Sequence, residues 1–237
     1  LPIGDNREIS FDQIEIISRK FKKIISIKEI KNLPKSLKKK IITDIKKVTS
    51  KKKNFSNFNF KNVPNIMGIL NLTPDSFSDG GKFNSQKKAV THAKQMYKSG
   101  ANIIDIGGES TRPGSKPINA KVEWNRIKNS LRLLNRKVPI SLDTRKSEIM
   151  EKGIKYGVKI INDVSGLNYD ENTLSVIKEY NCYYVLMHSL ETPRTMQINP
   201  KYENVIKDLY SFFLKKISLI KEENLNHSKI IIDPGIG

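Results

Sequence analysis

The fold can be inferred outward from one stretch of the sequence, Met67-Gly-Ile-Leu-Asn-Leu-Thr-Pro-Asp-Ser-Phe-Ser-Asp-Gly-Gly81. It begins apolar enough for a buried strand and becomes a polar loop at Asn71, which Pro74 and two glycines keep from continuing as strand or helix. An ordinary surface turn would explain the proline and glycines, but not the other residues gathered there: Asn71, Thr73, Asp75, Ser76 and Phe77. Parallel α/β proteins build active sites where buried strands deliver polar side chains to one rim. We therefore interpret this loop as part of an active site.

From this stretch onward, short apolar strands alternate with helical patterns. The predicted strands are 66–71, 102–106, 138–142, 158–161, 183–187 and 229–232. The predicted helices are one capped by Ser85 and ended by Gly100, then 120–136, 146–156, 171–180 and 203–224. Continuous apolar strands separated by helices are typical of a parallel sheet. Because polar residues follow all six strands, we favour an α/β fold of the (β/α)8 TIM barrel type over a doubly wound open sheet, whose site lies at one switch point.

Composition narrows the class of protein. The 237 residues carry a formal net charge of +19 and include one cysteine and three histidines. These counts argue against a disulfide framework and a zinc site, and they favour a reducing, cytoplasmic location. We expect no membrane segment, because no apolar run is long enough. Residues 1–53 hold 16 Lys and Arg against 6 Asp and Glu, and the other lysines are spread over helix faces, which predicts solvated surfaces rather than a nucleic-acid groove.

Residues 1–60 are predicted to be a basic helical appendage or linker, separate from a barrel domain at 61–237. Over residues 10–25, a Ser10–Gln13 capping box and the apolar spacing of Ile14, Ile17, Phe21 and Ile24 predict an amphipathic helix. A second helix is expected to open at Pro34 and to carry an apolar stripe of Leu37, Ile41, Ile45 and Val48. Residues 54–61 alternate polar and aromatic side chains and could form a short hairpin.

Three residues at predicted strand ends are the strongest candidates for chemistry: Asp143, Asn162 and Asp233. Two carboxylates and an amide can form hydrogen bonds with a planar heterocycle that has N–H donors beside acceptors. Each also has a structural alternative, such as a helix cap at Asp143 or a turn before Pro-Gly at Asp233. Their shared placement at strand ends favours a binding role.

Other polar groups suggest an anion and a metal ion. Thr111 and Arg112 lie in a Gly- and Pro-rich loop that can contact phosphate. Asn71 offers the neutral oxygen that Mg²⁺ accepts when phosphates supply its other ligands. We expect structural roles for His188 and Cys182.

Six segments together resemble dihydropteroate synthases, in that family's order and over residues 65–237. They are Gly68-Ile-Leu-Asn-Leu-Thr-Pro-Asp-Ser-Phe-Ser-Asp-Gly-Gly81, Ile104-Asp-Ile-Gly-Gly-Glu-Ser-Thr-Arg-Pro-Gly114, Ser141-Leu-Asp-Thr144, Ile161-Asn-Asp-Val164, Leu186-Met-His188 and Asp233-Pro-Gly235. The first two are long and specific. The resemblance implies a (β/α)8 barrel that joins 4-aminobenzoate to 6-hydroxymethyl-7,8-dihydropterin pyrophosphate and releases pyrophosphate in folate synthesis. It also implies a homodimer and a sulfonamide target.

The resemblance further implies a role for each matching residue. Asp143, Asn162 and Asp233 would hold the pterin, and Asn71 would bind Mg²⁺ on the pyrophosphate near Thr111. The two loops would close over aminobenzoate with Thr73, Pro74, Phe77, Arg112 and Pro113. The implied route is dissociative, with pyrophosphate leaving before the amine attacks a pterin-stabilised cation.

Two departures from the family pattern are visible. Its later elements, a Ser-Arg-Lys loop and an Arg-x-His, do not occur before Gly237, so we expect a C-terminally incomplete barrel and no turnover by this chain alone. Residues 1–60 could be the remnant of a fused pyrophosphokinase, although no kinase motif supports this. The alternatives are a pterin-binding methyltransferase domain and an inactive pterin- or RNA-binding remnant.

Overall fold

The computed structural model describes residues 1–18, 21–51, 54–56, 58–59, 64–73, 81–110, 115–135, 137–189 and 202–236. The chain divides into two compact units, which are described separately. Unit 1 comprises Leu1–Asn54 and Asn59–Val63, and unit 2 comprises Phe55–Phe58 and Pro64–Gly237.

Unit 1 is a small mixed unit with two antiparallel strand pairs. Strand β1 (Pro2–Ile3) pairs with β2 (Asn6–Ser10), and β3 (Gln13–Ile17) pairs with β4 (Lys22–Ser26). A 3₁₀ helix, η1 (Ile27–Asn32), and helix α1 (Lys35–Thr49) follow. The predicted helix at Pro34 is confirmed, with Pro34 at its N-cap. The expected hairpin at 54–61 is reduced, among its described residues, to one bridge between Phe55 and Phe58.

The predicted helix over residues 10–25 is wrong, because this segment forms β3 and β4. The apolar spacing fitted a helical stripe, but the segment is rich in isoleucine, whose branched Cβ favours strands. Pairing of Ile14 with Ile25 and of Glu15 with Ile24 then satisfies the backbone of both strands. The capping box lies elsewhere, at the start of η1, where Ser26 and Glu29 cap each other's backbone N–H groups.

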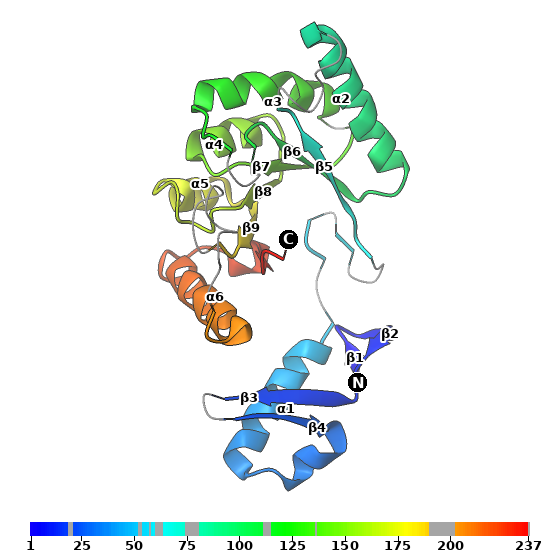
Figure 1. Cartoon of the computed structure of the whole chain (residues 1–237), viewed down its shortest axis with the longest axis vertical. Helices are drawn as coiled ribbons and strands as arrows, with labels where there is room; N and C mark the ends of the chain where they lie inside the picture. The colour runs from blue at the N-terminus through cyan, green and yellow to red at the C-terminus, as the bar shows by residue number, and fades with distance from the viewer. Residues whose placement is uncertain are drawn as a thin grey trace. The chain divides into compact units, whose positions relative to one another are not determined.

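Unit 2 is a parallel sheet with helices between its strands, which confirms the predicted α/β class (Figure 1). Its strands are β5 (Met67–Asn71), β6 (Ile103–Gly107), β7 (Ile140–Asp143), β8 (Ile160–Asp163), β9 (Tyr183–Met187) and β10 (Ile230–Asp233). They pair in chain order, so β5 and β10 are the edges of the described sheet. The helices are α2 (Gly81–Lys98), α3 (Ala120–Leu134), α4 (Ser147–Lys155), α5 (Thr173–Tyr180) and α6 (Val205–Glu222), with a short 3₁₀ helix η3 (His227–Lys229) before β10.

All six predicted strands and five predicted helices of this unit are present, with boundaries shifted by a few residues. The largest shift is in α2, which begins at Gly81, so Ser85 lies inside the helix and is not its cap. Ala89, Val90 and Ala93 of this helix are buried, and Met96 packs against the same core.

The two faces of the sheet have different chemistry. Ile104, Ile106, Leu142, Ile161, Tyr184 and Leu186 belong to a buried cluster with apolar side chains of the helices. Figure 1 shows α3, α4 and α5 side by side along this face. Side chains alternate between faces along a strand, so the residues between these apolar ones lie on the opposite face. On β6 and β7 these are Asp105, Gly107, Ser141 and Asp143.

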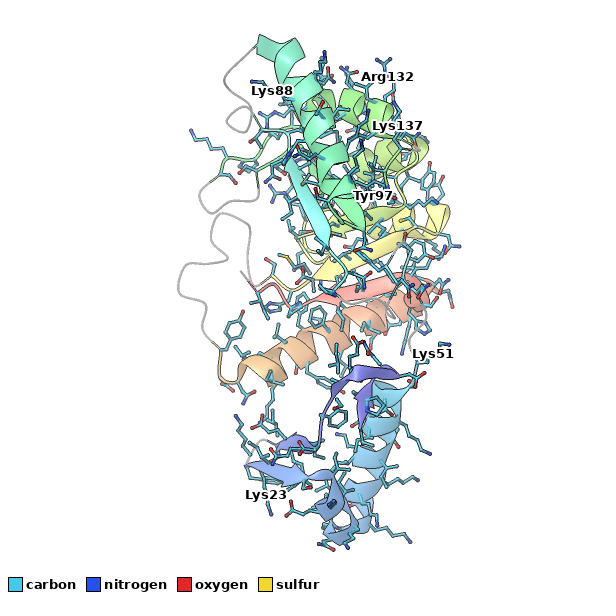
Figure 2. All side chains as sticks on the ribbon, turned by 90° about the vertical axis from the view of Figure 1, so that its right-hand side faces the viewer. Lys23, Lys51, Lys88, Tyr97, Arg132 and Lys137 are labelled. Carbon is cyan, nitrogen blue, oxygen red and sulfur yellow. The ribbon has the colours of Figure 1, made fainter. Side chains whose placement is uncertain are left out.

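The surface carries the positive charge of the chain on many separate elements. Figure 2 labels exposed cations on β4 (Lys23), α2 (Lys88) and α3 (Arg132). In the described part of the chain, no helix combines the length and the apolar character needed to cross a bilayer.

Candidate active site

A row of polar residues crosses the sheet at the carboxyl ends of its strands. The strand register places Asn71 of β5 beside Gly107 of β6, Gly107 beside Asp143 of β7, and Asp143 beside Asn162 of β8. Residues in register on neighbouring parallel strands share one face of the sheet. Three of the residues predicted to form the site are therefore brought into one row, which we call the rim row (Asn71, Gly107, Asp143, Asn162).

Gly107 leaves open a space beside the side chains of Asn71 and Asp143. A Cβ at position 107 would lie 3.2 Å from Asp143 Oδ2 and 3.5 Å from Asn71 Oδ1. Any residue larger than glycine at position 107 would therefore place its Cβ close to both oxygens. The next glycine, Gly108, has a packing role, because its Cβ would lie 2.8 Å from Cγ2 of Ile127 in α3.

A buried carboxylate, Asp105, lies one layer below the rim row. It pairs in register with Ser141 and is 5% exposed. The Asn162 side chain donates from Nδ2 to Asp105 Oδ2 over 2.9 Å. Burial raises the pKa of Asp105, while Ser141 and Asn162 beside it lower that pKa. The Ser141 hydroxyl is close enough to act on this pKa, although its geometry falls outside that of a hydrogen bond.

Asp143 is in an unfavourable electrostatic position for a carboxylate. Burial raises its pKa well above the ordinary value of 3.8, and the negative charges of Asp105, Glu123, Asp163 and Glu109 raise it further. A pKa raised in this way is typical of functional sites, where the fold holds an ionisable group in an environment that costs the protein stability.

Asp163, the residue after Asn162, has a structural role instead. Its carboxylate accepts hydrogen bonds from the backbone N–H and hydroxyl of Ser165, from the N–H of Leu167 and from the hydroxyl of Tyr184. It thus organises the loop that follows β8, and its side chain is fully buried.

Asp233 and His188 lie at the other end of the sheet. Asp233 is at the end of β10, two strands from Asn162, and its Oδ1 accepts from the Gly235 N–H over 2.8 Å. The structural alternative for Asp233, a turn before Pro-Gly, is therefore present in the fold. His188 is buried and meets the ring of Phe212 edge-on at 4.8 Å, and burial lowers its pKa, as a structural histidine would show.

Sequence reasoning missed a buried ion-pair cluster beside the rim row, formed by Glu109, Glu123, Arg145 and Lys146. Lys146 Nζ lies 2.8 Å from Glu109 Oε2 and 2.6 Å from Glu123 Oε2, and Arg145 Nε lies 3.1 Å from Glu109 Oε2. These pairs lower the pKa of Glu109 against the opposing effect of burial. Glu109, Arg145 and Lys146 follow two predicted strands and Glu123 lies in a predicted helix, but their pairing depends on how β6, α3 and β7 come together.

This cluster also anchors the second predicted loop. Glu109 Oε1 accepts from the backbone N–H of Ile118 over 2.9 Å, and the Ser115 hydroxyl donates to the carbonyl of Ser110 over 2.6 Å. The two ends of the segment between β6 and α3 are therefore held together. Pro74, Phe77, Thr111, Arg112 and Pro113, which the sequence analysis assigned to the site, lie outside the described residues. Thr73 is described and half-buried.

The donor groups of the site limit what metal it can hold. Among the described residues, no group of three His, Cys, Asp or Glu side chains could surround one ion. The Asn71 amide oxygen, aimed at the space over Gly107, is a hard neutral ligand suited to Mg²⁺ if a substrate supplies further oxygens. Cys182 is buried, and burial raises the pKa of its thiol to about 11, so it is a poor nucleophile.

Carboxylate and amide side chains thus stand at the carboxyl edge of a parallel β/α sheet, and known proteins share this fold. The model of the pterin binding enzyme family matches residues 67–237, so the chain belongs to that family. A curated relative is the dihydropteroate synthase of Synechocystis, 40% identical over 174 residues, which are 73% of this chain and 60% of the relative.

Solved structures of dihydropteroate synthases are also similar to this chain. The dihydropteroate synthase of Clostridium difficile, solved in the presence of pteroic acid, has a TM-score of 0.67 and 41% identity over 73% of this chain and 64% of that one. The Xanthomonas albilineans enzyme with 4-aminobenzoic acid has a TM-score of 0.67 and 34% identity over 73% of this chain and 62% of that one. These similarities confirm the predicted barrel class. The chain spans less than two thirds of the length of these relatives.

Proposed function

We propose that the protein joins 4-aminobenzoate to 6-hydroxymethyl-7,8-dihydropterin pyrophosphate and releases pyrophosphate, the reaction of a dihydropteroate synthase. The observation that carries this proposal is the rim row, with Asn71 and Asp143 beside the space left by Gly107 and with Asn162 next along the row. The relatives named above support it, since one structure was solved in the presence of pteroic acid and another with 4-aminobenzoic acid.

The rim row suits the pterin ring because the ring offers N–H groups that need acceptors. Asp143 and Asn162 lie side by side on neighbouring strands, and each side chain has an oxygen that can accept a hydrogen bond. In this proposal Asp233 supplies a third acceptor from β10 through the oxygen that its turn does not use.

The chemistry we propose needs little from a nucleophile or base of the protein. The bond between the pterin methylene carbon and the pyrophosphate oxygen breaks first, and its electron pair leaves with pyrophosphate. The amine of 4-aminobenzoate then forms the new carbon–nitrogen bond and loses a proton. The Asp143 carboxylate, at the carboxyl end of β7, stabilises the positive charge that develops on the pterin.

Asn71 is the residue we propose for Mg²⁺. Its amide oxygen faces the open space over Gly107, and pyrophosphate oxygens would complete the ligand set. When bound, the ion neutralises charge on the leaving group. The ring-binding side chains Asp143 and Asn162 lie further along the same row, so metal and ring have separate places.

The test is product formation, with both substrates and Mg²⁺, by a purified protein in which this chain is joined to the family's later elements, the Ser-Arg-Lys loop and the Arg-x-His, because no turnover is expected from the 237 residues alone. We expect dihydropteroate to appear with one pyrophosphate released per product, and no release without 4-aminobenzoate in the steady state. Methyl transfer from a folate to a cobalamin protein would instead support the methyltransferase alternative. Salt-dependent RNA retention without pterin affinity would support a binding remnant.

A further inference from the structure

The Asn162 amide is held in one orientation by a residue that the proposed reaction does not require for contact with substrate. A primary amide has a donating and an accepting end, which can exchange by rotation about the last side-chain bond. The donating end of Asn162, Nδ2, points to Asp105 Oδ2 at 2.9 Å. Its accepting end, Oδ1, is buried and has no hydrogen-bond partner among the described residues.

Asp105 is poorly explained as a stabilising residue. Buried carboxylates that serve the fold are well supplied with donors, as Asp163 is with four hydrogen bonds from Ser165, Leu167 and Tyr184. Asp105 Oδ1, in contrast, has no partner among the residues that the structure describes. A buried acceptor left in this state destabilises the fold, so its presence needs another reason.

We propose that Asp105 is a positioning residue, which fixes the Asn162 amide so that Oδ1 faces the ligand as a hydrogen-bond acceptor. An ionised carboxylate can only accept, so it selects the Nδ2 end of the amide and leaves Oδ1 for the rim row. The site then requires a ring with an N–H group at this point and disfavours one with a bare acceptor there. This inference rests on the proposed function, because it assigns the specificity of the same site.

The test is a double-mutant cycle read out by the affinity for pteroic acid. Asp105→Asn keeps the shape of the side chain but lets either end of the Asn162 amide face it. We expect this variant to bind pteroic acid at least about tenfold more weakly than the unsubstituted protein. In an Asn162→Ala background the same substitution should change affinity by less than about twofold, because the group on which Asp105 acts is gone.

A swapped pair supplies the rescue. In Asp105→Asn combined with Asn162→Asp, the amide introduced at position 105 can donate to the carboxylate introduced at position 162, which again presents an acceptor oxygen to the ligand. We expect affinity to return to within about threefold of the unsubstituted protein. Asp163→Asn is the control, since it removes a buried carboxylate next to Asn162 in sequence. It should lower the melting temperature and show an effect on affinity that is independent of Asn162.

The outcomes separate this inference from the proposed function. If the unsubstituted protein does not bind pteroic acid, the proposed function fails and the inference fails with it. If it binds, and Asp105→Asn weakens binding equally with and without Asn162, Asp105 has a structural role and the inference is overturned. Unchanged affinity in Asp105→Asn, or no rescue by a swapped pair that melts cooperatively, would overturn it as well.

Discussion

At the scale of single residues, the site has side chains that the fold would be more stable without. Asp143 lies among four other acidic groups, and burial together with their charges raises its pKa. Asp163 and Glu123, whose carboxylates are also buried, are compensated by hydrogen bonds or a lysine. This contrast supports the proposal that Asp143 binds a ligand, whereas Asp163 and Glu123 stabilise the fold.

Asp143→Asn should raise the melting temperature at neutral pH while it removes pteroic acid binding. The folded-state pKa lies above the unfolded value of 3.8, so the ionised form destabilises the protein above the folded pKa. Stability of the unsubstituted protein should therefore rise relative to the variant as the pH falls through that pKa. Melting temperatures of the two proteins across this range test the claim. A variant that is less stable at neutral pH would contradict it.

Asp233→Asn separates a binding role from a turn role. The amide oxygen of asparagine can still accept from the Gly235 N–H, so the turn should persist and the melting temperature should change little. Loss of a hydrogen bond to a charged group should weaken pterin binding by roughly 1.5–3 kcal/mol, or about tenfold to a hundredfold. Calorimetry with pteroic acid is the measurement. Unchanged affinity together with a lower melting temperature would favour the turn role alone.

At the scale of elements, unit 2 could be predicted from sequence and unit 1 only in part. The strands of unit 2 are continuous apolar runs bounded by glycines and polar loops, and their order follows from the parallel fold. Residues 10–25 carried a helical spacing that the pairing of β3 with β4 overrode. At the site, Asp143 and Asn162 were predictable because they end strands. The position of Asp105 beside Asn162 and the pairing of Glu109 with Lys146 could not be predicted from sequence, because both depend on how the strands pair.

The buried ion-pair cluster should matter more for stability than any surface pair. Lys146→Met would leave Glu109 and Glu123 buried without their shared cation, which should lower the free energy of unfolding by about 3–5 kcal/mol. The matched control is Lys152→Met, since Lys152 forms an exposed pair with Glu148 and should cost less than about 0.5 kcal/mol. Denaturant unfolding of both variants checks the difference. Equal losses would mean that the cluster is not the anchor we infer.

At the scale of the whole molecule, the chain divides into two compact units, and we propose that these units have separate roles. All residues of the rim row belong to unit 2, which is also the part matched by the family model. Unit 1 has its own strand pairs, its own helix and its own capping box. The homodimer implied by the resemblance stays a prediction, which sedimentation equilibrium of the purified protein would check.

Ser26→Ala tests this separation. Loss of the Ser26 cap should destabilise unit 1 by about 1 kcal/mol and speed hydrogen exchange in η1, with no change in pteroic acid affinity. Ser36→Ala, at an exposed serine within α1, is the control and should leave exchange in η1 unchanged. A change in ligand affinity with Ser26→Ala would show that unit 1 contributes to the site.

The central claim is that the rim row holds a pterin ring, and a crystal structure of the protein grown with pteroic acid tests it most directly. We predict the ring at the Asp143–Asn162 end of the rim row, with N–H groups within hydrogen-bond distance of an Asp143 oxygen and of Asn162 Oδ1. The Asn162 Nδ2 group should remain on Asp105. A ring bound elsewhere on the protein, with Asp143 and Asn162 free of it, would contradict the account.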